Sequence, residues 1–392
     1  MSARWFIFFL FVAALEAKTV CLNMIVKNES EVIERCLNSC KDWIDYWVIV
    51  DTGSTDGTQE KIKKFMKDKP GELHERPWVD FAHNRNQAFQ LAKNKADYLL
   101  FIDADELLRF DCKIDKKTLS KPYYCSIVQE PDVRSIRVLL VNTAYAWDWV
   151  GVIHEGLAAP GVSVDYLQCL DGVCKVSNTK DGFRSKDPNK YLKDAQVLEK
   201  ALQKEPDKTR YAFYLAQCYI NAEENLLALK SYEKRAQMQG AEEERWYSFY
   251  MAARLHQSLN YPSEVITREF CRAFQERNYR AEPLGYLAHY HYSQGNAALA
   301  YALTELALQI PRPLDVVFVE DWFYDYGFRA IHADAAVALG MNETALRDYR
   351  KVLECKQLPS DVREKVTAVL KTLENIEGNL YTPEHGQISG RE

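Results

Sequence analysis

Short apolar runs that each end in a polar cluster constrain this fold more than any other feature of the sequence. Their length and side chains are those of buried strands. We expect strands at residues 19–26, 46–50, 73–78 and 98–102. Apolar side chains at helical spacing predict helices at residues 30–43, 58–66 and 82–93. Strands that alternate with helices in this order predict a parallel sheet with right-handed crossovers.

Polar clusters directly follow three of these strands. They are Lys27-Asn28-Glu29, Asp51-Thr52-Gly53-Ser54 and Asp103-Ala104-Asp105-Glu106. Because parallel strands end at the same edge of a sheet, we expect the three clusters to lie close together. Open sheets of this kind bind their ligands at that edge. The sequence therefore predicts a ligand site made by these loops.

The pattern changes in the middle of the chain and again after it. Further strands, a mixed or antiparallel extension of the sheet, are expected at residues 136–142, 149–154, 162–167 and 172–177. Beyond residue 189 the chain has helical spacing almost to its end. We therefore expect a first domain at residues 18–188, a helical domain at residues 189–378 and a flexible tail at residues 379–392.

Small residues recur in the helical part in pairs that are twelve positions apart. These pairs are Ala216 with Ala228, Ala288 with Ala300, and Ala333 with Ala345. The first and second pairs are 72 residues apart, which is two steps of 36 and close to the tetratricopeptide period of about 34. Residues 246–274 have the position of a degenerate unit between them. The pattern predicts an all-α tetratricopeptide-like repeat domain, with an irregular helical bundle as the alternative.

The first 17 residues have a different character. Residues 5–15 form an unbroken apolar run after Arg4, shorter than the roughly 20 apolar residues of a membrane-spanning helix. The run suits a signal peptide or a short membrane anchor, and a segment packed on the domain is the alternative. A signal or anchor implies the secretory pathway or membrane association, and its absence implies the cytoplasm. In an exported chain, Cys112 with Cys125 and Cys169 with Cys174 have the spacing of small disulfide loops.

The composition excludes one class of partner. Hydrophobic residues make up 47% of the chain, which is typical of globular proteins, and the formal net charge is -6. Nucleic-acid binding requires a concentrated basic face, so we expect no nucleic acid partner.

Asp103 and Asp105 are the central candidates for chemistry. Two carboxylates at positions i and i+2 after a buried strand are able to reach one divalent cation between them. Carboxylate oxygens are hard ligands that suit Mg²⁺ or Mn²⁺, particularly a cation that also binds a diphosphate. Most acidic pairs in loops are only solvated, so the preceding apolar strand is what makes this pair informative.

The segment from Val50 to Thr58, with its Asp-Thr-Gly-Ser-Thr-Asp-Gly sequence, resembles the family 2 glycosyltransferases of the GT-A fold. The resemblance extends over about residues 20–240. It implies an α/β nucleotide-diphospho-sugar transferase domain with a Rossmann-like mixed sheet. It also implies that Asp51 binds the nucleotide base, that Glu29 lies near the nucleoside, and that Arg85 holds a carboxylate of the metal site or a phosphate oxygen. Thr52 departs from the family, in which many members have a second aspartate.

Residues 147–155, with Trp147, Asp148 and the pair His154-Glu155, resemble a subset of these transferases with C-terminal repeats. That subset includes the peptide S-glycosyltransferases of bacteriocin clusters. The resemblance predicts His154 as a further metal ligand and Glu155 as the general base, with Asp148 as the reserve base. A satisfied histidine beside an exposed glutamate is the alternative. Trp147 and Trp149 are candidates for a wall under a sugar ring, or for core residues.

Arg184 lies in a segment, residues 181–185, that also resembles the family. It is expected either to reach the diphosphate or to form an ion pair at the domain junction.

Together these residues predict a metal-dependent, inverting glycosyltransferase that uses a nucleotide-sugar donor, in particular a UDP-sugar. The sugar would be a hexose or an N-acetylhexosamine, and the acceptor a protein, a glycan or a lipid that the repeats help to hold. The alternative is a catalytically weak or dead scaffold whose repeats bind a protein partner. Nucleotidyl transfer ranks last, because Lys27-Asn28-Glu29-Ser30 is not a glycine-rich phosphate loop.

Overall fold

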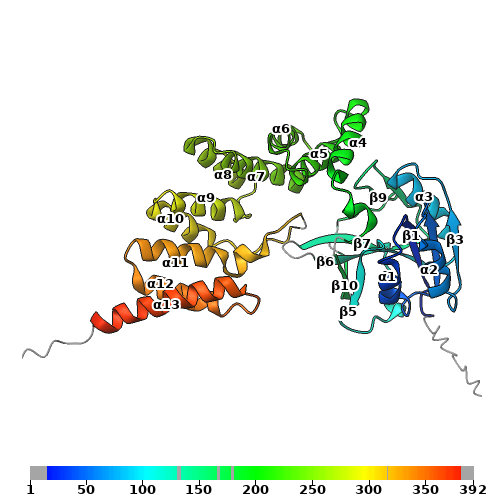
Figure 1. Cartoon of the computed structure of the whole chain (residues 1–392), viewed down its shortest axis with the longest axis horizontal. Helices are drawn as coiled ribbons and strands as arrows, with labels where there is room; N and C mark the ends of the chain where they lie inside the picture. Colours follow the sequence, from blue (N-terminus) through cyan, green and yellow to red (C-terminus); the bar gives the residue numbers. More distant parts are fainter. Residues whose placement is uncertain (1–15, 130–133, 166–167, 178–180, 316, 381–392) are drawn as a thin grey trace, which may run out of the picture. The chain divides into compact units, whose positions relative to one another are not determined.

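The computed structural model describes residues 16–129, 134–165, 168–177, 181–315 and 317–380 (Figure 1). The chain divides into two compact units, Met1–Pro131 with Ser135–Lys190 and Asp132–Arg134 with Tyr191–Glu392. The sequence-based boundary after residue 188 lies close to this division. The predicted signal or anchor and the predicted tail fall almost entirely on residues 1–15 and 381–392, outside the described residues. No helix in the described ranges is both long and apolar enough to cross a membrane.

The first unit contains a mixed sheet with the strand order β3-β2-β1-β4-β7-β6-β10-β5. Its strands are β1 (Val20–Val26), β2 (Tyr46–Asp51), β3 (Gly71–Glu75), β4 (Tyr98–Phe101), β5 (Leu107–Phe110), β6 (Tyr123–Gln129), β7 (Arg134–Asn142) and β10 (Cys169–Val176). A separate antiparallel pair joins β8 (Asp148–Val150) to β9 (Gly156–Ala158). The predicted mixed α/β sheet is confirmed.

Strands β1 to β4 form the parallel half, because β1 pairs in parallel with β2 and β4, and β2 with β3. Val26 lies beside Asp51 and Asp51 beside Glu75, so neighbouring strands end at the same edge. The antiparallel part begins at β7, which runs against β4. The predicted polar loops after β1, β2 and β4 therefore emerge along one edge.

Helices cover both faces of the parallel half. They are α1 (Ile33–Cys40), α2 (Thr58–Phe65) and α3 (Phe81–Ala92). Val20, Leu22 and other alternate residues of β1 share a core with α1 and α2, whereas Cys21 shares a core with Phe89 of α3. Alternate side chains of a strand point to opposite faces, so α1 and α2 cover one face and α3 the other. This explains why β1 is apolar almost throughout.

Several strand predictions in the middle of the chain are wrong. Residues 162–165 of the predicted strand at 162–167 contain only an isolated bridge, between Val162 and Ala159. The strand expected at residues 149–154 ends at Val150, because the chain turns at Gly151 (φ 122°) and His154 (φ 51°). Strands β5, β6 and β9 were not predicted. Cys112 and Cys174 are free thiols, so neither of the two expected disulfides forms.

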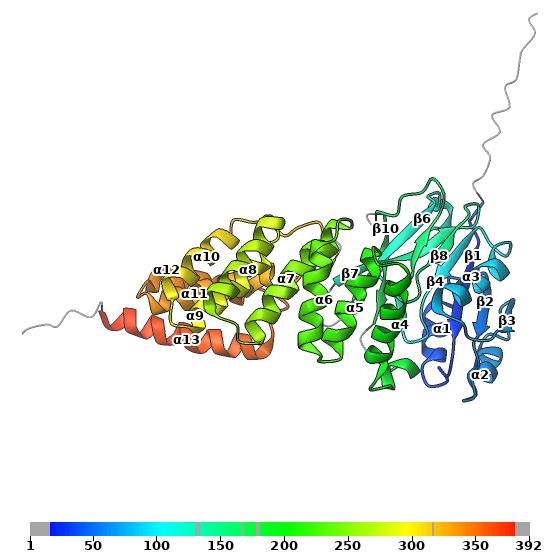
Figure 2. The same ribbon diagram turned by 90° about the horizontal axis from the view of Figure 1, so that it is seen from above.

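The second unit consists of helices that follow one another as a stacked array (Figure 2). They are α4 (Lys190–Lys204), α5 (Thr209–Asn221), α6 (Asn225–Gln237), α7 (Glu242–Ser258), α8 (Ser263–Glu276), α9 (Glu282–Ser293), α10 (Ala297–Ala307), α11 (Phe328–Ala338), α12 (Asn342–Leu353) and α13 (Ser360–Leu380). A π-helical turn, η3 (Phe323–Gly327), leads into α11.

The predicted small residues lie where consecutive helices pack as pairs. Ala216 and Ala228 lie on α5 and α6, and Ala288 and Ala300 on α9 and α10. The third pair lies on α11 and α12, and all six alanines have no exposed surface. Helices α7 and α8 form the degenerate unit that was expected at residues 246–274. A small side chain lets two helix backbones approach closely, so the repeat pattern of the sequence has a direct structural cause.

Candidate functional site

Asp51, the last residue of β2, has a buried carboxylate in which hydrogen bonds reach only one of the two oxygens within the described structure. Its Oδ1 accepts hydrogen bonds from the backbone N–H of Gly53 (2.9 Å) and Ser54 (2.8 Å) and from Nε2 of Gln59 (3.1 Å). Its Oδ2 is buried and has no hydrogen-bond partner within the described structure. A buried carboxylate oxygen without a donor is costly, so a ligand N–H or O–H is the natural partner here.

Asp103 and Asp105 follow β4 and differ in their surroundings. Burial favours the neutral form of Asp103, but the positive charges of Arg85 and Lys175 hold the pKa of this carboxyl well below its usual range. Burial and the negative charges of Asp103 and Glu106 raise the pKa of Asp105. The Asp103 side chain keeps 43% of its surface exposed. Like charges this close repel one another, and a cation would relieve that repulsion.

Arg85, in the second turn of α3, bridges two predicted site residues. Its Nη2 donates to Oδ1 of Asp103 (2.7 Å), and its Nε donates to Oε1 of Glu155 (2.5 Å). The guanidinium also lies 5.1 Å from the ring centre of Trp149. A planar guanidinium presents donors in a fixed fork, which suits two carboxylates in one plane. Arg85 was expected to hold either a carboxylate of the metal site or a phosphate oxygen, and in the structure it holds the carboxylate of Asp103.

The Asn86 side chain, which follows Arg85 on α3, connects α3 to the β8–β9 pair. Asn86 accepts from the backbone N–H of Trp149 (2.8 Å) and donates to its carbonyl (2.9 Å). Trp149 in turn packs its ring against Phe101 at 5.0 Å. Trp147 is core, with 3% of its surface exposed and its Nε1 donating to the Asn142 carbonyl. Trp147 is therefore a core residue, and the half-buried Trp149 packs against Phe101 and Arg85.

Glu29, after β1, lies against the segment that follows β10. Its Oε2 accepts from the Phe183 backbone N–H at 3.1 Å. Burial raises the pKa of Glu29 to about 7; the Phe183 N–H opposes this, and the charges of Asp105, Asp56 and Asp103 add to it. Since Coulombic effects fall off with distance, Glu29 shares the acidic neighbourhood of the two aspartates.

Residues 181–186 close over this acidic cluster. Asp181 accepts a two-pronged ion pair from Arg35 at 2.9 Å. Glycine is needed at position 182, because a Cβ atom there would lie only 2.7 Å from Oδ2 of Asp105 and would clash with it. The Arg184 guanidinium lies 4.8 Å from the ring centre of Phe81, at the start of α3. Both roles expected for Arg184, an approach to a diphosphate and an ion pair at the domain junction, stay predictions.

His154 and Asp148 lie apart from the metal candidates. His154 is exposed and adopts the left-handed conformation, and Asp148 is exposed on β8. Within the described ranges, no group of three or more His, Cys, Asp or Glu side chains is arranged to hold a metal ion. The structure therefore does not gather His154 with Asp103 and Asp105. Carboxylate oxygens are hard ligands that suit a divalent cation, and the binding of one by Asp103 and Asp105 together with a diphosphate stays a prediction.

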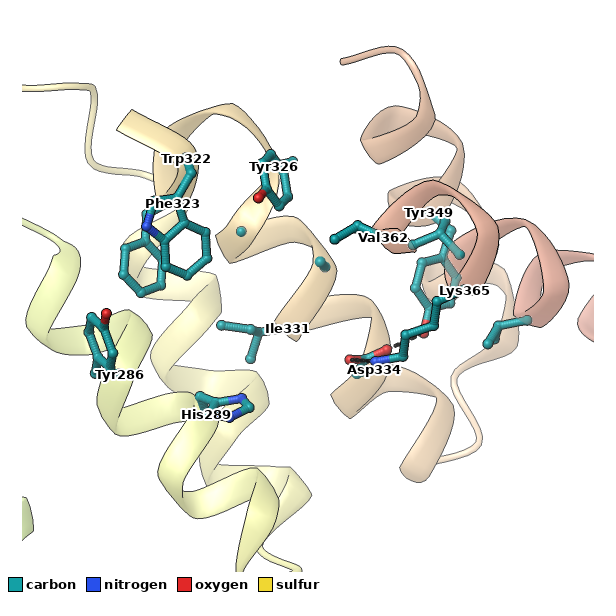
Figure 3. Close-up of a pocket in the computed structure, with 14 residues that line it drawn as sticks. Tyr286, His289, Trp322, Phe323, Tyr326, Ile331, Asp334, Tyr349, Val362 and Lys365 are labelled. Atoms are coloured by element: carbon teal, nitrogen blue, oxygen red, sulfur yellow. Dashed lines mark hydrogen bonds and ion pairs between the residues drawn. The ribbon is translucent and has the colours of Figure 1, made fainter. Parts of the chain in front are cut away.

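The second unit has a cavity of about 390 Å³ that contains none of the predicted site residues (Figure 3). Tyr286, Trp322 and Tyr326 line one side of it, and Val362 lies across from them. Its walls also include Asp334 and Lys365, other residues of α11 and α13, and parts of α9, η3 and α12. An apolar cavity with aromatic walls is a feature of binding sites.

Comparison with known proteins finds a family match within the first unit. Residues 21–115 match the model of glycosyl transferase family 2. The match contains β1 to β4 and the polar loops that follow β1, β2 and β4.

Curated relatives each match about a quarter of the chain. A TPR repeat-containing protein of Synechococcus elongatus is 40% identical over 90 residues, which are 23% of this chain and 21% of the relative. The SPbeta prophage-derived glycosyltransferase SunS of Bacillus subtilis is 37% identical over 93 residues, 24% of this chain and 21% of SunS. An uncharacterized glycosyltransferase of Rickettsia bellii is 34% identical over 94 residues, 24% of this chain and 30% of its own. The matches thus span less than a third of each relative.

Some solved structures match part of the chain at low sequence identity. MamA shares 15% identity over 43% of this chain and 90% of its own, with a TM-score of 0.36. The C-terminal part of a TPR repeat-containing protein from Cytophaga hutchinsonii shares 18% identity over 50% of this chain and 70% of its own, with a TM-score of 0.39.

Proposed function

We propose that the first unit transfers a sugar, a hexose or an N-acetylhexosamine, from a UDP-sugar to a protein, glycan or lipid acceptor, with inversion at the anomeric carbon. The Asp51 carboxylate carries this proposal. Its Oδ2 is buried and lacks a partner, at the edge where the Asp103 and Asp105 loop also emerges. A nucleoside that donates a base N–H to Asp51 would place its diphosphate toward the two aspartates.

The side chains of the site have separate roles in this proposal. Asp103 and Asp105 would hold Mn²⁺ or Mg²⁺ together with the donor diphosphate. Such a cation supplies Lewis-acid stabilisation of the departing diphosphate when it is bound. Arg85 holds Asp103 in place, because one guanidinium joins it to Glu155. His154 stays a proposed additional ligand that would have to approach from its exposed position.

The acceptor proton needs a base near the reacting carbon. Glu155 is the proposed base, because the shared Arg85 places it on the same side of the site as Asp103. Its side chain is 9% exposed, so little water would compete with an acceptor hydroxyl or thiol. Asp148 remains the reserve base, on the neighbouring strand and exposed.

Glu29 and Arg184 complete the proposed donor site. Glu29 lies at the end of β1, between the strands that carry Asp51 and Asp103, where a ribose would pass. Arg184 would turn from the Phe81 ring toward the diphosphate. We propose that the repeats bind an acceptor, and that the 390 Å³ cavity takes part. The protein would work at a membrane or in the secretory pathway if residues 1–17 act as a signal or anchor, and in the cytoplasm otherwise.

A panel of nucleotide sugars, incubated with the full chain and Mn²⁺, tests the proposal directly. We expect slow donor hydrolysis with UDP-sugars, loss of hydrolysis with a chelator, and a rise in melting temperature on adding UDP with Mn²⁺. The scaffold alternative, which the aromatic cavity of the second unit favours, predicts neither hydrolysis nor a UDP-dependent rise. Hydrolysis without any metal would remove the cation from the proposal.

A further inference from the structure

An exposed tryptophan stands on a rigid loop between β3 and α3. Trp78 and Val79 keep 42% and 54% of their surface exposed. Asn84, which is fully buried, accepts from the Val79 N–H (2.9 Å) and donates to the Pro77 carbonyl (3.0 Å). Asp80 caps α3 by accepting from the His83 N–H (2.7 Å). Hydrogen bonds to Asn84 and Asp80 thus hold the backbone of the loop, while the Trp78 side chain stays partly exposed to solvent.

A backbone contact places this loop beside the end of β2. The Arg76 N–H donates to the carbonyl of Asp51 at 2.9 Å. Trp78 is two residues further along, and two residues of extended chain span at most about 7 Å. The backbone of Trp78 therefore lies within about 7 Å of that of Arg76, near the strand end that carries Asp51.

The neighbouring ring connects the loop to the other end of the site. Trp78 meets the ring of Phe81 edge-on, with 4.8 Å between the ring centres. The Arg184 guanidinium lies over Phe81, and Gly182, two residues before Arg184, packs against the Asp105 carboxylate. The pair of Trp78 and Phe81, here called the aromatic wall, is thus tied to Asp51 on one side and to Asp105 on the other.

We infer that the aromatic wall is the stacking surface for the nucleobase of the bound donor, with Trp78 as its main face. The base would donate its N–H to the unpartnered Oδ2 of Asp51 and lay its ring against Trp78. Asp51 then selects by hydrogen bonding, whereas Trp78 adds affinity through a π-surface that any base provides. Trp147 is buried in the core, whereas Trp78 keeps 42% of its surface exposed and therefore offers a ring for stacking.

Binding of UDP and of a baseless analogue to the full chain tests this role. Stacking on one aromatic side chain contributes about 1–3 kcal/mol per base, so Trp78→Ala should raise the Kd for UDP-Mn²⁺ by roughly 5- to 150-fold. Trp78→Phe should recover most of the affinity. Pyrophosphate-Mn²⁺, which has no base, should bind the wild type and Trp78→Ala alike. UDP should also quench tryptophan fluorescence in the wild type, and most of that quenching should vanish in Trp78→Phe.

The matched control is Tyr145→Ala, which removes another exposed aromatic side chain of the same unit. It should leave the Kd for UDP unchanged. Because the nucleobase is that of the proposed donor, the role of Trp78 rests on the proposed function, yet the two fail differently. Absence of UDP binding in the wild type would overturn the proposed function. Normal UDP binding in the wild type with an equal Kd in Trp78→Ala, or a changed acceptor KM alone, would overturn the role of Trp78.

Discussion

Glu320 in the second unit and Asp51 in the first unit both have buried carboxylates, but they differ in how many of their oxygens have hydrogen-bond partners. In the second unit, Glu320 accepts from the hydroxyls of Tyr250 (2.5 Å) and Tyr286 (3.1 Å). It also accepts from Arg254 and from the Trp322 indole N–H, both at 3.2 Å. Both oxygens are therefore in use, and the side chain joins α7, α9 and the segment before η3.

At the sheet edge of the first unit two carboxylates are left incomplete. Asp51 has a buried oxygen without a donor among the described residues, and burial together with the charges of Asp103 and Glu106 raises the pKa of Asp105. Satisfied carboxylates stabilise a fold, whereas incomplete ones cost stability and are kept where a ligand completes them. The contrast therefore separates structural acids from candidate functional acids, and mutations at the two places should differ in kind.

Asp105→Ala should have the largest effect, and on activity only. We expect sugar transfer to fall by about 10³-fold or more, because charge that develops on the departing diphosphate loses its partner. The melting temperature should stay the same or rise, since a repelled carboxylate is removed. Turnover and thermal unfolding of the full chain measure both effects.

The control for this change is Asp111→Ala, which removes an exposed aspartate whose side chain is 60% accessible and pairs with Arg109. It should alter neither activity nor melting temperature. Near-normal transfer by Asp105→Ala would refute the role of the strand-end acids.

Glu320→Ala should show the opposite pattern, a loss of stability without a loss of donor binding. Removing one partner of a buried charged network leaves the others unsatisfied, and we expect a cost of about 3 kcal/mol in the free energy of unfolding. Urea unfolding measures it, with Glu374→Ala as the control, because that side chain is 44% exposed in its pair with Arg350. Equal unfolding free energies for Glu320→Ala and Glu374→Ala would contradict the structural role of Glu320 and therefore the contrast between the two units.

The smallest expected effect is a pH dependence that comes from Glu29. Its pKa is raised from 4.5 to about 7 in the folded chain, so between these values the folded state binds more protons than the unfolded state. The contribution of Glu29 to stability should therefore fall as the pH rises from about 4.5 to about 7. Glu29→Gln should lack this fall.

Unfolding free energies of the two proteins, measured at intervals from pH 5 to pH 8, give the difference. The stability advantage of Glu29→Gln over the wild type should grow with pH. A constant difference across this range would show that Glu29 titrates normally.

Much of the fold was readable from local patterns. The strands β1, β2 and β4 carry apolar side chains on both faces, so their composition predicts burial without knowledge of their neighbours. The paired alanines predicted the helix pairs because close helix packing demands a small residue at a fixed spacing. By contrast, β9 and β5 are three and four residues long, too short to show a period.

The candidate site was readable only in part. Asp51, Asp103 and Asp105 follow predicted strands, so the sheet alone determines where they lie. The pairing of Arg85 with Glu155 joins residues that are 70 positions apart, and the packing of Gly182 on Asp105 likewise depends on the folded chain. Neither contact can be predicted from a pattern of neighbouring residues in the sequence.

By itself, the sequence determined which segments become strands and helices and which acids stand at strand ends, because these follow from periodicity along the chain. The tertiary structure alone decided which oxygens keep a partner and which ring stays exposed. Glu320 is satisfied by Tyr250 and Tyr286, which lie 70 and 34 positions away in the sequence, whereas Oδ2 of Asp51 receives no such partner among the described residues. Hydrogen bonding and burial depend on proximity in space, which folding creates and which no local pattern records.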